Sequence, residues 1–206
     1  MTSEPRQAIK RCAPSRVRRF LGAAKVRDLA RYWNVTAEER TNAYPCDRYM
    51  HAPYEAFLRA VDVDAPPEVV FRWLCQLKVA PYSYDWIDNR GRRSPRSLTP
   101  GAEKLGLGQE FLIFRLVEFE SNRHITGVVQ LRFERVFGRL TVSYLVEPRD
   151  ADRCRLVSCI DLALPTSVLG KVRQTLLAYG DLFMMRKQLL TLKRCAEQTA
   201  ERHASS

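Results

Sequence analysis

The hydrophobic residues between positions 164 and 201 recur in steps of three and four, which predicts one long amphipathic helix. We expect this helix to begin after Pro165, and the rest of the chain to close around it. Gly180 lies in its middle and costs about 1 kcal/mol relative to Ala, so it indicates either a slight bend or room for a neighbouring group. A first apolar stripe comprises Val168, Leu169, Val172, Leu176, Tyr179, Phe183 and Leu190. A second comprises Leu182, Met185, Leu189, Leu192 and Ala196.

Alternating apolar and polar positions predict β-strands before this helix. In residues 54–64, Phe57, Val61 and Val63 share one face, and Arg59 falls unexpectedly on that same apolar face. Prolines 66 and 67 end this strand and suit the first turn of a helix that should reach residue 77. Further strands are predicted over residues 109–119, 123–132, 139–147 and 153–163.

Because no helix is predicted between these later strands, the sheet should be antiparallel. The element order therefore predicts an α+β fold, in which a curved antiparallel sheet wraps around the long C-terminal helix. Space between the sheet and this helix can form a cavity. We assign residues 1–50 to a basic N-terminal extension, partly helical or mobile, with a candidate helix over 15–33, and residues 51–206 to the folded domain.

The most distinctive stretch is residues 81–96, PYSYDWIDNRGRRSPR, which places three aromatic residues within five positions. One interpretation is a short helix and turn that pack Tyr82, Tyr84 and Trp86 on the edge of the sheet, with solvated arginines. The other is an aromatic entrance to a pocket, with the arginines facing an acidic group or a lipid headgroup.

Several segments together resemble the START-like, or SRPBCC, helix-grip superfamily, which includes polyketide cyclase/dehydratase-like and lipid-transfer proteins. The matching segments are 61–77 (VDVDAPPEVVFRWLCQL), 98–109 with its LTPG and GLGQ turns, the strand meander, and 180–197 (GDLFMMRKQLLTLKRCAE). The run at 81–96 resembles a bacterial, uncharacterised branch of this group. The resemblance covers residues 54–200 and implies a cavity, between sheet and C-terminal helix, that holds an apolar or aromatic small molecule.

About half of the excess positive charge lies in the N-terminal quarter of the chain. The chain has a formal net charge of +11, and residues 1–50 hold eleven Lys and Arg against five Asp and Glu. A weak contact of residues 1–33 with an anionic membrane is therefore one interpretation, beside a loosely docked tail. A nucleic-acid arm is disfavoured because the arginines accompany no recognised binding motif. The sequence leaves the oligomeric state open.

No apolar run is long enough for a transmembrane helix, and no secretory signal pattern is visible. The six cysteines form no CxxC pair, so we expect reduced thiols in a cytoplasmic protein. Cys154 and Cys159 should point to opposite faces of one strand, which argues against a zinc site there. We predict no metal and no cofactor, and no motif identifies a catalytic residue.

The preferred function is binding of a hydrophobic small molecule, such as a lipid, a polyketide-like compound or an aromatic compound. One alternative is a cyclase or dehydratase, which would need Arg59, Asp85, Asp88 or Asp181 to line the pocket. The other is a membrane-surface or regulatory protein that acts through its basic arm. Arg59 and Arg115 could each bind a ligand carboxylate or pair with a core acid. The predicted ligand contacts are Arg59, Tyr82, Tyr84, Trp86, Phe111, Arg115, Tyr144, Tyr179 and Phe183.

Overall fold

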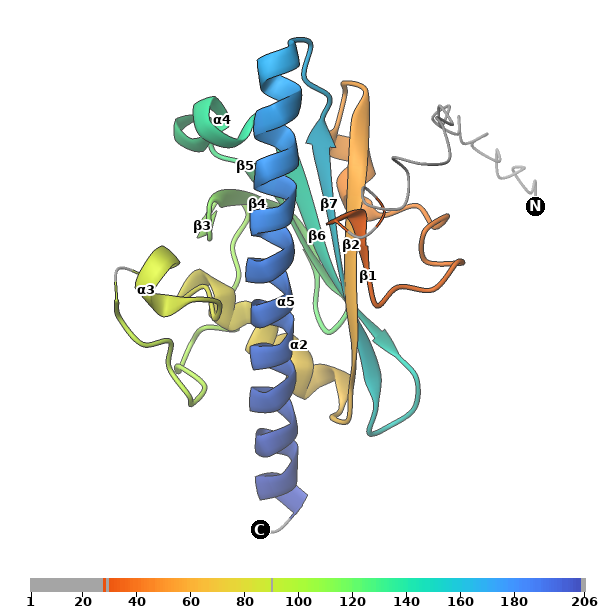
Figure 1. The fold of residues 1–206 in the computed structure, drawn as a ribbon. Coiled ribbons are helices and arrows are strands. Elements are labelled where there is room, and N and C mark those ends of the chain that lie inside the picture. The colour runs from red at the N-terminus through yellow and green to blue at the C-terminus, as the bar shows by residue number, and fades with distance from the viewer. Residues whose placement is uncertain (1–27, 29, 90, 205–206) are drawn as a thin grey trace, which may run out of the picture.

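One seven-stranded sheet crossed by a long helix forms the body of the protein in the computed structural model, which describes residues 28, 30–89 and 91–204 (Figure 1). The strand order is β1-β2-β7-β6-β5-β4-β3. The strands are β1 (Tyr32–Trp33), β2 (Tyr54–Val63), β3 (Glu110–Phe111), β4 (Phe114–Glu120), β5 (His124–Val129), β6 (Leu140–Pro148) and β7 (Cys154–Ala163). The helices are η1 (Pro45–Tyr49), α2 (Pro67–Cys75), η2 (Gln76–Lys78), α3 (Asp85–Asp88), α4 (Leu131–Phe137) and α5 (Val168–Ala204).

This architecture confirms the predicted α+β helix-grip fold. All strand pairs are antiparallel except β1 with β2, so the sheet is mixed rather than purely antiparallel. The strands β2, β6 and β7 match the predicted ranges within about one residue, because alternating runs of nine or ten residues are a clear strand pattern, although residues on both faces of these strands are buried.

Two predicted strands need correction. The strand expected over 109–119 is a hairpin, because the chain turns between β3 and β4 at Leu112, whose φ is +56°. The strand expected over 123–132 ends at Val129 and is followed by α4, a helix that the pattern did not predict. Phe133 and Phe137 of α4 turn toward the main core, whereas Leu131 and Val136 are exposed.

The sequence did not predict which of the two apolar stripes of α5 would be buried. The second stripe, with Met185, Leu189, Leu192 and Ala196, is buried against the sheet and α2. The first stripe, which begins at Val168, is largely exposed. The sheet therefore closes around the C-terminal half of the helix, while the N-terminal half keeps an apolar outer face.

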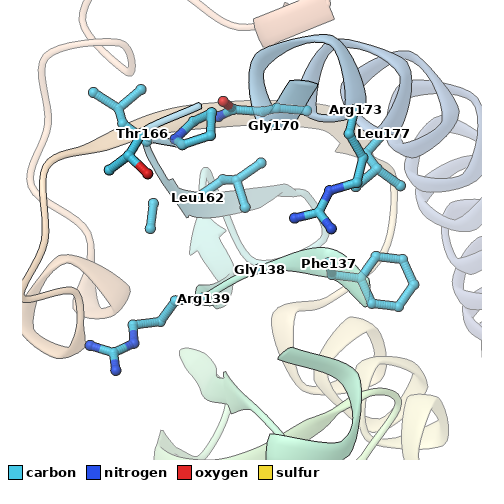
Figure 2. Close-up of a pocket in the computed structure, with 12 residues that line it drawn as sticks. Phe137, Gly138, Arg139, Leu162, Thr166, Gly170, Arg173 and Leu177 are labelled. Carbon is cyan, nitrogen blue, oxygen red and sulfur yellow. The ribbon is translucent and has the colours of Figure 1, made fainter. Parts of the chain in front are cut away.

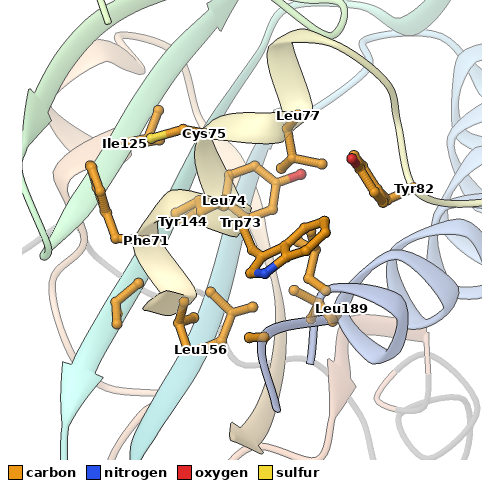
Figure 3. Packing of buried hydrophobic residues seen from close by; sticks show 14 of the residues in the cluster. Phe71, Trp73, Leu74, Cys75, Leu77, Tyr82, Ile125, Tyr144, Leu156 and Leu189 are labelled. Atoms are coloured by element: carbon orange, nitrogen blue, oxygen red, sulfur yellow. The ribbon is translucent and has the colours of Figure 1, made fainter. Parts of the chain in front are cut away.

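The main core lies between the sheet, α2 and α5. Trp73 is its largest fully buried side chain, and its indole Nε1 donates to Thr199 Oγ1 of α5 at 3.0 Å. The ring of Tyr82 meets Trp73 edge-on, with centroids 6.0 Å apart (Figure 3). These contacts join α2, the 79–84 loop and α5 into one wall.

The segment around Tyr44 and Cys46 packs on the sheet face that α5 does not cover, whereas Ala30 packs beside Phe57 and Ala178 of α5. β1 pairs with β2, and Tyr44 and Cys46 are buried against Leu58 and Val157. Most of the candidate helix over 15–33 lies outside the described residues, and its last two positions form β1. The domain boundary at residue 50 stays a prediction, although these contacts favour an earlier one. In the described part of the chain, no helix combines the length and apolar character that a membrane span requires.

Candidate functional site

A cavity of about 740 Å³ lies between the sheet and the middle of α5. Its walls come from β2, β6, β7, the hairpin β3–β4, the loop after η2, α4 and α5. Most of the lining side chains are apolar, and polar side chains are few. The lining residues include Phe57, Leu77, Val79, Leu112, Ile113, Phe114, Phe133, Phe137, Leu140, Ile160, Leu162, Leu176, Leu177, Met184 and Met185. The polar ones are Lys78, Ser83, Glu110, Tyr144, Asp181 and Gln188.

A buried ion pair joins β2 to α5 at the cavity wall. Arg59 Nη2 lies 3.2 Å from Asp181 Oδ2, and Arg59 is 1% exposed. The same guanidinium donates to the carbonyl oxygens of Ala30 and Arg31 at 2.7 and 2.8 Å. Arg59 therefore has partners on two other segments of the chain, which explains how a charge can occupy an apolar strand face.

Asp181 faces the cavity itself. Its side chain is enclosed by protein and lines the cavity, and 31% of its surface is accessible. Burial raises the pKa of Asp181 to about 6, and the nearby Arg59 charge limits the rise. A carboxyl with that pKa can either hold or release a proton near neutral pH.

A chain of hydrogen bonds crosses the cavity wall beside this pair. Tyr144 Oη of β6 donates to Gln188 Oε1 of α5 at 2.7 Å, and Gln188 Nε2 donates to the carbonyl of Pro81 at 2.7 Å. Burial raises the pKa of Tyr144, so the phenol stays protonated and serves as a donor. Gln188 thus holds the 79–84 loop against the sheet.

Ser83 supplies a polar atom without a partner. It lines the cavity, is 9% exposed, and its buried Oγ has no hydrogen-bond partner in the described structure. A hydroxyl in that position costs free energy unless a water or ligand satisfies it. Gly180 also lines the cavity, and a Cβ added there would meet no atom within 4 Å.

The predicted ligand contacts are scattered, and among the described residues Tyr144 alone of them lines the cavity. Arg59 and Phe111 lie directly behind the lining, Arg59 through Asp181 and Phe111 through an edge-on contact with Tyr144 at 6.1 Å. Tyr82 packs on Trp73 in the core, and Tyr84 and Tyr179 are half-buried. Trp86, Arg115 and Phe183 are exposed. The ligand contacts as a set stay predictions.

The four candidate acid–base residues also differ in position. Asp181 lines the cavity, and Arg59 contacts it. Asp85 instead accepts hydrogen bonds from the backbone N–H and hydroxyl of Ser94, at 3.0 and 2.6 Å, and so holds the turn after α3. The side chain of Asp88 lies outside the described part of the structure.

Sequence analysis missed Ser83, Gln188, Phe133 and Phe137 as cavity residues. The phenylalanines belong to the helix that was not predicted, and a polar residue such as Gln188 on a long helix looks like an ordinary solvated position. One signal was available: Gln188 is three residues after Met185 and four before Leu192, on the helix face that proves to be buried. Its 4% exposure then requires partners such as Tyr144 and Pro81.

A smaller pocket of about 210 Å³ adjoins the cavity near the start of α5 and shares Phe137, Leu162 and Leu177 with it. Figure 2 shows Arg173 reaching from α5 toward Phe137, whereas Arg139 points away. Arg173 Nη1 donates to the carbonyl of Arg135 at 3.4 Å, which connects α5 to α4 beside the cavity.

No protein-family model matches the chain, and no curated protein matches it. The chain is similar to several solved structures. One is a norcoclaurine synthase point mutant from Thalictrum flavum in complex with a transition state analogue. The identity is 11%, the match covers 73% of this chain and 98% of that chain, and the TM-score is 0.46. The Zhui aromatase/cyclase from Streptomyces sp. R1128 has 15% identity, 74% and 96% coverage, and a TM-score of 0.42. A START superfamily protein from Mycobacterium smegmatis has 14% identity, 73% and 99% coverage, and a TM-score of 0.40. Likeness at this level says nothing of family, ligand or activity.

Proposed function

We propose that this protein binds a hydrophobic small molecule in the cavity between the sheet and α5. The observation that carries the proposal is a space of about 740 Å³ lined mainly by apolar side chains. Ligand pockets commonly measure about 300–1,000 Å³ and combine an apolar lining with a few fixed polar groups. Burial of an apolar ligand surface would supply the free energy of binding.

The polar groups narrow the class of ligand. Ser83, whose buried Oγ has no hydrogen-bond partner among the described residues, and Asp181 both line this mainly apolar space. A ligand with an apolar body and at least one hydroxyl or carbonyl group fits this arrangement, because it would satisfy Ser83 without burying an unpaired polar atom of its own. Lipids, polyketide-like compounds and aromatic compounds with such groups belong to this class.

Fluorescence titration with anilinonaphthalene sulfonate, a probe with an aromatic body and one sulfonate group, tests the proposal on the full chain. We expect one saturable site, which Gly180→Trp weakens by about tenfold or more because the indole fills open space at the cavity. The matched variant Gly180→Ala should bind as the wild type does. Leu169→Ser removes part of the exposed α5 stripe and controls for binding to that surface. Equal binding by all four proteins would refute a cavity site.

An enzyme that acts in the same cavity is the second candidate, and Asp181 is the observation that favours it. A carboxyl with a pKa of about 6 beside an arginine suits a general base that removes a proton α to a carbonyl. A substrate screen with polyketide-like carbonyl compounds tests this candidate. Turnover that Asp181→Asn abolishes, with probe binding unchanged, would favour the enzyme. The membrane interpretation concerns residues 1–33, nearly all of them outside the described residues, and stays a prediction.

A further inference from the structure

Four side chains with metal-binding atoms converge on the sheet face opposite the cavity. Cys46 and Asp47 come from η1, and Cys159 and Asp161 come from β7. One ligand atom of each lies within 4.8 Å of the other three. Alternation along β7 separates this cluster from the cavity, because the neighbouring Ile160 and Leu162 line the cavity on the other face.

The cluster is buried and incompletely satisfied. Cys46, Cys159 and Asp161 are each 0% exposed, and Asp161 Oδ2 has no hydrogen-bond partner in the described structure. Asp47 is half-buried and connects the cluster to solvent. Buried carboxylates are almost always paired or bound to a cation.

The surrounding contacts fix these side chains in place. Thr141 Oγ1 of β6 donates to the carbonyl of Cys46 at 3.3 Å, and the backbone N–H of Tyr44 donates to Asp47 Oδ2 at 3.0 Å. The Cys159 thiol lies 3.7 Å from Asp161 Oδ1. Metal ligands typically depend on such supporting hydrogen bonds for their orientation.

We propose that Cys46, Asp47, Cys159 and Asp161 bind one thiophilic divalent cation of the zinc class. Two thiolates and two carboxylates form a four-ligand set of the kind Zn²⁺ accepts in tetrahedral sites, whereas Ca²⁺ and Mg²⁺ select oxygen ligands alone. The cation would link η1 to β7 across 113 residues of sequence. Its role is structural, since the site lies away from the cavity and all four positions belong to the protein.

The sequence did not reveal this site because its ligands occur as two short pairs, Cys46-Asp47 and Cys159-x-Asp161, far apart in the chain. The cysteine pair weighed there was Cys154 with Cys159. These two do face opposite sides, Cys154 in the main core and Cys159 in the cluster with Cys46.

Cobalt substitution of the full-length wild-type protein tests the proposal directly. The protein is stripped with a chelator under reducing conditions and titrated with Co²⁺. We expect one equivalent to bind with thiolate-to-cobalt charge-transfer absorption and tetrahedral d–d bands. X-ray absorption of the Zn²⁺ form should show two sulfur ligands at about 2.3 Å. No stoichiometric binding, a cation without sulfur ligands, or a Cys46–Cys159 disulfide in place of binding would overturn the proposal.

Variants then assign the ligands. Cys159→Ser should abolish the charge-transfer bands, and Asp47→Asn, at a half-buried position, should lower the affinity for Zn²⁺ by about tenfold or more. Cys75→Ser is the matched control, because Cys75 is equally buried but lies in the main core. Zn²⁺ should raise the melting temperature of the wild type and of Cys75→Ser, through binding to the folded state. A rise of equal size in Asp47→Asn would contradict the assignment.

Discussion

Arg59 Nη2 lies 3.2 Å from Asp181 Oδ2, and this contact joins β2 of the sheet to the helix that closes the cavity. The two residues are 122 positions apart in sequence. The pair places one carboxyl at the cavity wall and ties Ala30 and Arg31 to β2 through the same guanidinium.

Asp181 should titrate near pH 6, above its ordinary value of 3.8. Between those values the folded state holds a proton that the unfolded state has lost, so this group favours folding at low pH and favours it less as the pH rises through 6. NMR titration of the side-chain carboxyl measures the pKa directly. Asp181→Asn should remove this part of the pH dependence of stability.

Arg59→Met should raise the pKa of Asp181 further, because the guanidinium is the charge that limits the effect of burial. Arg115→Met is the control, since Arg115 is exposed and should leave that titration unchanged. A titration of Asp181 near 3.8 in the wild type, or no response to Arg59→Met, would contradict the described pair.

Arg155 should contribute most to holding residues 34–39 against the sheet. It is 5% exposed, pairs with Glu39 and Asp62, and donates to the carbonyl of Asn34 at 2.6 Å. Arg155→Met leaves Glu39 buried without its cation and should cost about 3–5 kcal/mol of unfolding free energy. Urea denaturation measures this cost. Arg153→Met, at an exposed pair with Asp150, is the control and should change stability little.

Glu39 makes the stability that this ion-pair network contributes depend on pH in the acid range. Burial alone would raise its pKa, but hydrogen bonds from Arg155 and Thr36 outweigh burial and hold the pKa below 4.5. Its contribution to stability is therefore complete above about pH 4.5 and is lost as the pH falls through the lower folded value. Glu39→Gln should flatten stability against pH in that range. An unchanged profile would mean that the pair does not form in solution.

Leu189 belongs to the buried apolar stripe of α5, and Leu176 belongs to the exposed one. Leu189 is fully buried, so Leu189→Ala should destabilise the fold by about 2–5 kcal/mol through lost burial and a new cavity. Leu176 is 70% exposed, and Leu176→Ala should stay within about 0.5 kcal/mol of the wild type. Chemical denaturation of both variants measures these losses of unfolding free energy. Equal losses would contradict the assignment of Leu189 to the buried face of α5 and Leu176 to the exposed face.

Tyr144 and Gln188 should behave as a coupled pair. Tyr144→Phe leaves Gln188 Oε1 without its donor and should cost about 1–3 kcal/mol. Gln188→Leu should also destabilise, because it frees the carbonyl of Pro81. The double variant should lose less than the two single losses combined. Strict additivity in this cycle would show that the hydrogen bond contributes nothing.

The sequence predicted the elements whose hydrophobic pattern is long. β6, β7 and α5 are found where they were expected, since nine or more regular positions leave one consistent assignment. α4 was not predicted, because seven residues are too few to separate a helical period from strand alternation. The turn at Leu112 carries neither Gly nor Asn, so the usual signal for a positive φ is missing.

The candidate site was less predictable than the fold for a different reason. Periodicity shows that α5 has two apolar stripes, but only tertiary packing decides that the one with Leu189 is buried. Arg59 was unexpected in its strand and Asp181 was a candidate pocket residue, yet their pairing depends on the tertiary fold. Cys46 and Cys159 approach each other only because η1 folds back over β7.

Native mass spectrometry of the purified full-length protein, followed by organic extraction, tests the central claim most directly. We predict one apolar molecule per chain in the wild type and in Gly180→Ala, and little or none in Gly180→Trp. The extracted molecule should have an apolar body and a hydroxyl or carbonyl group. A mass without any adduct, together with no saturable binding of an apolar probe, would contradict the claim that the cavity is a ligand site.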